Sequence, residues 1–134
     1  MTADTSAVVA ALSAWHEQHD AAAAALRRVV AIPAHVVLES YSVLTTLPGG
    51  LAVPAATAAS VLAERFDGEP LRMPGAERGA LLSELAAAGV LGGASYDGLV
   101  ALEARAHGRR LLTLDRRAAE TYRRLGVAFE VIAD

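Results

Sequence analysis

The chain has 134 residues, of which 54% are hydrophobic and 20% charged, with a formal net charge of −3. This length suits a single domain that buries most of its apolar surface, and we expect that domain to span residues 1–134. Cysteine is absent, and all 12 basic residues are arginine. Disulfide frameworks, thiolate metal sites, lysine-dependent phosphate loops and Schiff-base chemistry are therefore excluded.

The first half of the chain alternates short apolar runs with helical patterns. A short strand leads into Asp4, and a helix follows whose apolar face is formed by Val8, Val9, Leu12 and Trp15. An alanine run predicts a helix over residues 16–29, and the β-branched segment 29–32 predicts a buried strand. Pro33 and Pro54 each suit the start of a further helix, the first reaching the turn at Pro48 and the second reaching Glu64.

The second half continues this alternation. We expect, in chain order, a strand over 70–73, a helix over 77–88, a helix capped by Ser95 that reaches about His107, a strand over 110–113, a helix from Asp115 through Leu125 and a strand over 127–132. Glycines at 89, 108 and 126 stand where the helices should end. Strands separated by helices predict an α/β domain with a mainly parallel central sheet of four to five strands flanked by helices.

Residues 40–63 carry no charge and are numerous enough to cross a bilayer. Prolines and paired glycines interrupt this stretch, however, and a break exposed to lipid would leave backbone polar groups without partners. Two apolar helices joined by a Pro-Gly-Gly turn are the better interpretation. We expect a cytoplasmic protein without a membrane segment.

Four acids hold positions typical of a site. Asp4 and Asp115 follow predicted strands, Asp97 lies in the first turn of a helix, and Glu39 lies among apolar helical residues. Ligands of parallel α/β sheets bind beyond the carboxyl ends of the strands. Acids gathered there would repel one another, and a divalent cation such as Mg²⁺ or Mn²⁺ would remove that penalty.

Each acid also has a purely structural interpretation. Asp4 and Asp115 would serve as helix caps, and Asp97 would complement a helix dipole. Glu39 is harder to explain in this way, because a carboxylate among apolar neighbours costs free energy unless it is paired. His35, four residues earlier, could pair with Glu39 on the same helix face.

These acids stand in four short motifs that together resemble those of the PIN domain: Asp4-Thr5-Ser6, Glu39, Ser95-Tyr96-Asp97-Gly98-Leu99 and Leu112-Thr113-Leu114-Asp115. Their order, their spacing and the chain length resemble the VapC toxins of bacterial type II toxin–antitoxin systems. The resemblance covers nearly the whole chain. Gly98 departs from it, because the family commonly has alanine there, and a glycine costs helix propensity.

The resemblance implies a metal-dependent endoribonuclease whose catalytic acids are Asp4, Glu39, Asp97 and Asp115. Mg²⁺ or Mn²⁺ would bind to Asp4, Asp97 and Asp115, while Glu39 would orient or deprotonate a water molecule. The hydroxyls of Thr5 and Thr113 would support this cluster. Residues 105–124 hold seven arginines and two acids, a balance of +5. We therefore take Thr5, Thr113, Arg116 and Arg117 as candidates for substrate contacts.

The resemblance also implies a cognate VapB-type antitoxin, an RNA substrate such as tRNA or rRNA, and a homodimer. The uncharged helices within residues 40–63 could hold the antitoxin or form the dimer seam. Two alternatives remain open at this point. One is a PIN-type RNA-processing nuclease outside any toxin pair, and the other is a catalytically silent α/β interaction module.

Overall fold

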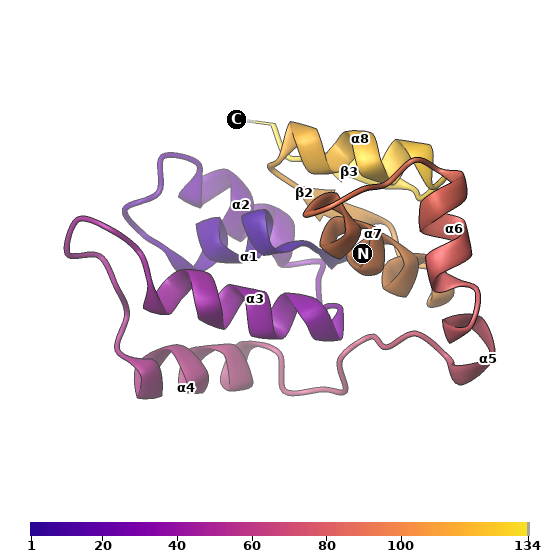
Figure 1. Cartoon of the computed structure of the whole chain (residues 1–134). Helices are drawn as coiled ribbons and strands as arrows, with labels where there is room; N and C mark the ends of the chain where they lie inside the picture. Colours follow the sequence, from indigo (N-terminus) through magenta and orange to yellow (C-terminus); the bar gives the residue numbers. More distant parts are fainter. Residues whose placement is uncertain (134) are drawn as a thin grey trace.

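The computed structural model describes residues 1–133, which form three strands and eight helices (Figure 1). In chain order these are β1 (Thr2–Ala3), α1 (Thr5–Leu12), α2 (His19–Leu26), α3 (Ala34–Thr45), α4 (Ala55–Arg65), α5 (Gly75–Arg78), α6 (Leu81–Ala87), α7 (Ala94–Ala106), β2 (Leu111–Thr113), α8 (Arg116–Arg124) and β3 (Phe129–Val131). The predicted α/β architecture is confirmed.

The sheet is parallel and has the strand order β1-β2-β3. Thr2 of β1 pairs with Leu111 of the central strand, which pairs in turn with Phe129 of β3. Because all three strands point the same way, the residues that follow β1 and β2 meet at one edge of the sheet. That edge brings Asp4 and Asp115 together.

The expected count of four to five strands is wrong, because residues 29–32 and 70–73 form no strands. The two segments touch through a single bridge between Pro33 and Leu71, in which Leu71 N donates to Ile32 O at 2.9 Å and Ala34 N donates to Leu71 O at 2.9 Å. Proline has no N–H to extend such a ladder, and Val30 is 70% exposed rather than buried. A prediction from apolar composition alone therefore gives the sheet too many strands.

Several helix boundaries also differ from the predictions. The helix expected over 77–88 is divided into α5 and α6 at Gly79, and the helix expected over 16–29 is shortened to α2. Gly93 rather than Ser95 takes the N-cap position of α7. Trp15 lies beyond the end of α1 and is 50% exposed, so it does not extend the buried face of that helix.

The helices expected after Pro33, Pro54 and Asp115 are present. The uncharged stretch contributes to α3 and α4, two helices that lie side by side (Figure 1). Gly108 and Gly126 have φ values of 63° and 68° directly after α7 and α8, a conformation that suits glycine. The largest fully buried side chain is that of Tyr122, on α8. Within residues 1–133, no helix is both long and apolar enough to cross a membrane.

Candidate active site

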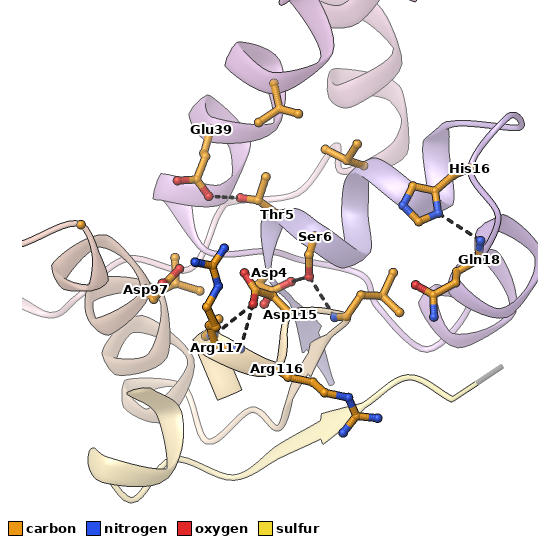
Figure 2. Close-up of a pocket in the computed structure, with 16 residues that line it drawn as sticks. Asp4, Thr5, Ser6, His16, Gln18, Glu39, Asp97, Asp115, Arg116 and Arg117 are labelled. Carbon is orange, nitrogen blue, oxygen red and sulfur yellow. Dashed lines mark hydrogen bonds between the residues drawn. The ribbon is translucent and has the colours of Figure 1, made fainter. Parts of the chain in front are cut away.

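A cavity of about 670 Å³ opens at the carboxyl edge of the sheet, and the four acids singled out above all line it (Figure 2). They come from four separate elements: Asp4 follows β1, Asp115 follows β2, Glu39 lies on α3 and Asp97 on α7. Thr5, Arg116 and Arg117 also line the cavity. The fold thus brings together side chains that are up to 111 residues apart in the sequence.

Asp4 is only 5% exposed, and its carboxylate accepts hydrogen bonds from three donors. Its Oδ1 accepts from Ser6 Oγ at 2.6 Å and from the N–H of Ala7 at 3.2 Å, and its Oδ2 accepts from Tyr122 Oη at 2.7 Å. Burial raises the pKa of Asp4, and these hydrogen bonds oppose the shift. The same burial, together with the Asp4 charge, raises the pKa of Tyr122, so its phenol remains a donor.

Asp115 caps α8 by accepting from the N–H groups of Arg117 at 2.9 Å and Ala118 at 3.3 Å. Its own N–H donates to Thr113 Oγ1 at 2.9 Å. Thr113 is fully buried and is not among the residues that line the cavity, and its hydroxyl holds the loop that carries Asp115. The helix-cap interpretation of Asp115 is therefore correct, and it is compatible with a place in the cavity.

Ser6 connects the two strand ends. Its hydroxyl donates to Asp4, accepts from the N–H of Leu114 at 2.9 Å and lies 3.3 Å from Thr113 Oγ1. Ser6 stands within the first acidic motif, but the sequence gives no sign of this linking role. The same holds for Tyr122, whose contact with Asp4 joins residues 118 positions apart. No local pattern could have indicated that contact.

Glu39 faces the cavity from α3 with two partners. Thr5 Oγ1 donates to its Oε1 (Figure 2). His35 Nε2 lies 3.4 Å from its Oε2, as the four-residue spacing suggested. The His35 ring stacks on Tyr96, with 5.4 Å between ring centroids and an interplanar angle of 11°. Glu39 is thus oriented from both α1 and its own helix.

Asp97 differs from the other acids because no donor in residues 1–133 gives its carboxylate a hydrogen bond. Burial and the charges of Glu39, Asp115 and Asp4 raise the pKa of Asp97 to about 6, with a small opposing contribution from His35. The carboxylates of the other three acids therefore repel that of Asp97 across the cavity. No group of three His, Asp or Glu side chains within residues 1–133 is arranged to hold an ion directly.

Positive charge reaches the cavity through Arg116 and Arg117, whose guanidinium groups form no ion pair within residues 1–133. Three other arginines of the basic segment are engaged elsewhere: Arg105 with Glu84 at 2.6 Å, and Arg123 and Arg124 with Glu120. The basic segment therefore offers fewer free arginines than its charge of +5 suggests.

Comparison with known proteins agrees with this arrangement. The PIN domain family matches residues 1–124. Ribonuclease VapC40 of Mycobacterium tuberculosis is 43% identical over 129 residues, which cover 96% of each chain. Ribonuclease VapC27 of the same species is 40% identical over 134 residues, covering 99% of this chain and 97% of the relative. The chain belongs to the PIN domain family, among the VapC ribonucleases.

Proposed function

We propose that this protein is a VapC-type endoribonuclease toxin that cleaves RNA phosphodiester bonds at the acidic cavity. The observation that carries the proposal is the meeting of Asp4, Glu39, Asp97 and Asp115 on one cavity, in a chain whose ribonuclease relatives match nearly its full length. We further propose that the PIN domain includes the whole of residues 1–134, beyond the 1–124 that the family matches.

The donor set suits Mg²⁺ or Mn²⁺. Carboxylate oxygens are the ligands that these hard cations prefer, and Mg²⁺ keeps several waters, so it needs no closed protein cage. The Asp97 carboxylate accepts no hydrogen bond within residues 1–133, and burial together with three neighbouring carboxylates raises its pKa, so a bound cation would stabilise its charge more than that of the other acids. Asp4, Asp97 and Asp115 would hold the ion, which supplies Lewis acidity and neutralises phosphate charge.

The residues of the chain then have distinct roles. Asp4 is fixed by its three donors, and its geometry is therefore set before substrate arrives. Glu39, oriented by Thr5 and His35, accepts a proton from the attacking water or orients it. Arg116 and Arg117 hold the RNA backbone at the rim, where bidentate contacts with phosphate oxygens suit a guanidinium.

The proposed partners are a VapB-type antitoxin and an RNA such as tRNA or rRNA. An apolar groove of about 400 Å³ between α3 and α4 is a candidate binding site for the antitoxin. The residues that line it include Leu38, which is 67% exposed. A second copy of the chain is the competing occupant, and a homodimer stays a prediction. Because its substrate would be cellular RNA, we expect the protein to act in the cytoplasm.

Two experiments test the proposed function. The chain should arrest growth when expressed alone and not when expressed with the antitoxin, and mapped RNA ends should show defined cleavage positions. The purified chain should cleave the same RNA with Mg²⁺ or Mn²⁺ and not with chelator. Cleavage without toxicity would favour an RNA-processing nuclease instead, and the absence of any cleavage would favour a silent interaction module.

A further inference from the structure

Two exposed aromatic side chains lie next to residues of the acidic cavity in the sequence. The chain is poor in such residues, with one tryptophan, three tyrosines and two phenylalanines. Trp15 is 50% exposed and Tyr96 is 59% exposed, whereas the other four rings are buried or partly buried. The Trp15 ring packs on His16, which lines the cavity, and the Tyr96 ring stacks on His35, which lies 3.4 Å from the cavity-lining Glu39. Neither ring contributes much to the core, so folding alone does not account for their positions.

Trp15 lies in the turn that follows α1. Its ring packs against that of His16, with 5.6 Å between centroids and an interplanar angle of 42°. The turn fixes this pair, because the N–H of His16 donates to Ser13 O at 2.9 Å and the N–H of Gln18 donates to His16 Nδ1 at 3.0 Å. The indole thus packs on a residue that is itself fixed and that lines the cavity.

Tyr96 is supported in a similar way on α7. One face of its ring stacks on His35, whose Nε2 lies 3.4 Å from the Glu39 carboxylate. With 59% of the residue exposed, the ring remains accessible to a further planar group. An offset stack of this kind extends readily, because aromatic faces attract one another in parallel-displaced geometry.

The cavity residues that follow Trp15 and Tyr96 in the sequence, His16 and Asp97, lie on opposite sides of Asp4 and Asp115 (Figure 2). Figure 2 places His16 at one end of the cavity and Asp97 at the other, with Asp4 and Asp115 between them. A chain that crossed the acids with its phosphate at the centre would therefore meet one aromatic pair before the cleavage point and the other after it.

We propose that Trp15 and Tyr96 stack on the nucleobases on the two sides of the scissile phosphate. This inference rests on the proposed ribonuclease function. Bases held in a duplex stack on one another and do not present a free face, whereas splayed-out bases stack on tryptophan, tyrosine and histidine. Arg116 and Arg117 would hold the intervening backbone.

Trp15 is the single tryptophan of the chain, which gives a binding signal that does not depend on cleavage. In the Asp97→Asn protein, a short single-stranded oligoribonucleotide should quench tryptophan emission. A fully paired hairpin of the same composition and inorganic polyphosphate should quench it much less. Equal quenching by polyphosphate would show that charge alone is sensed and would overturn the stacking proposal.

Substitutions identify the two contacts. Trp15→Ala and Tyr96→Ala should each weaken RNA binding by about five- to 100-fold, the range measured for loss of one base–aromatic stack. Trp15→Phe and Tyr96→Phe should restore most of the affinity. Leu82→Ala, which removes a 76% exposed apolar side chain far from the cavity, is the matched control and should bind as the parent does.

Abasic nucleotides placed one at a time along the RNA should remove the effect of Trp15→Ala at one position and of Tyr96→Ala at another, on opposite sides of the cut. If both alanine variants bind and cleave RNA normally but escape the antitoxin, the rings belong to a protein interface and the proposal is wrong. If the unaltered protein cleaves no RNA with Mg²⁺, the proposed function fails, whatever the quenching result.

Discussion

The two sides of the acidic cavity are built differently. Asp4 and Asp115, which follow strands, cap α1 and α8 and accept backbone N–H groups. Glu39 and Asp97 project from α3 and α7; Glu39 relies on two side chains, and Asp97 accepts no hydrogen bond within residues 1–133. The fold therefore fixes the strand-borne acids by itself, whereas the Asp97 carboxylate faces the charges of the other acids without a hydrogen bond within residues 1–133. This contrast can be tested on each side separately.

The largest effect is expected on the helix-borne side. Asp97→Asn should lower kcat/KM for RNA by at least about 100-fold. It removes a carboxylate whose charge is opposed by burial and by the three other acids of the cavity. Circular dichroism should show an unchanged fold, since the side chain packs no core. Asp67→Asn, an exposed acid outside the cavity, is the control. Full activity of Asp97→Asn would refute the assignment.

A smaller loss of activity is expected when Asp4, on the strand-borne side, loses one of its hydrogen-bond donors. Tyr122→Phe removes the hydroxyl that binds Asp4 Oδ2 while keeping the buried ring. Mg²⁺ affinity and kcat/KM should fall by about 10- to 100-fold, as is typical when a partner of a ligand is lost, and stability should fall by about 1–2 kcal/mol.

Tyr41→Phe is the matched control for this substitution, since Tyr41 lies on α3 beside the apolar groove and its hydroxyl has no hydrogen bond within residues 1–133. Metal titration and thermal melts of both variants measure the two effects. An unchanged Mg²⁺ affinity in Tyr122→Phe would mean that the remaining donors, Ser6 and Ala7, suffice to hold Asp4.

The pH dependence of stability should report the repulsion directly. The pKa of Asp97 is raised from 3.8 to about 6 in the folded protein, so the unfolded chain releases this proton first as the pH rises. The free energy of unfolding in chelator should therefore fall between pH 3.8 and about 6 and then level off. Allowing for the partial exposure of Asp97, we expect its share to be about 1–2 kcal/mol.

Urea unfolding of the parent and of Asp97→Asn at pH 4.5 and 7.5, both in chelator, isolates this share as the difference between the two proteins. Added Mg²⁺ should restore stability to the parent at pH 7.5, because it binds only the folded site, and Mn²⁺ should do so at a lower concentration. An equal metal response in both proteins would mean that Asp97 does not belong to the ion site.

The sequence predicted the positions of the strand-borne acids but not the distant contact that helps to hold Asp4, for a physical reason. An acid directly after an apolar run and before a helix is a local signal, and so Asp4 and Asp115 could be placed without a structure. Neither the contact of Tyr122 with Asp4 nor the exposure of Trp15 has a local signal, because both depend on where the chain turns. The strand expected over residues 29–32 failed likewise, since pairing depends on a distant partner.

The packing around Gly98 also could not be predicted from local sequence, and a substitution there is expected to have the smallest effect. From sequence alone this glycine costs helix propensity, and replacing it with alanine would gain about 1 kcal/mol. In the structure, a Cβ at Gly98 would lie 2.4 Å from Leu85 Cδ2 and 3.5 Å from Val90 Cγ1, so α7 packs closely on the region of α6. Because Leu85 is buried, relief of that clash costs about 1–3 kcal/mol.

We therefore expect Gly98→Ala to destabilise the protein by about 1 kcal/mol and to displace α7. That movement carries Asp97 but leaves Asp4 and Asp115 in place, because they are held by β1, β2 and α8. Mg²⁺ stabilisation should fall several-fold, and Leu85→Ala in the same chain should offset part of the loss, which a double-mutant cycle measures. If Gly98→Ala instead stabilised the protein with an unchanged metal response, the packing of α7 would not determine the position of Asp97.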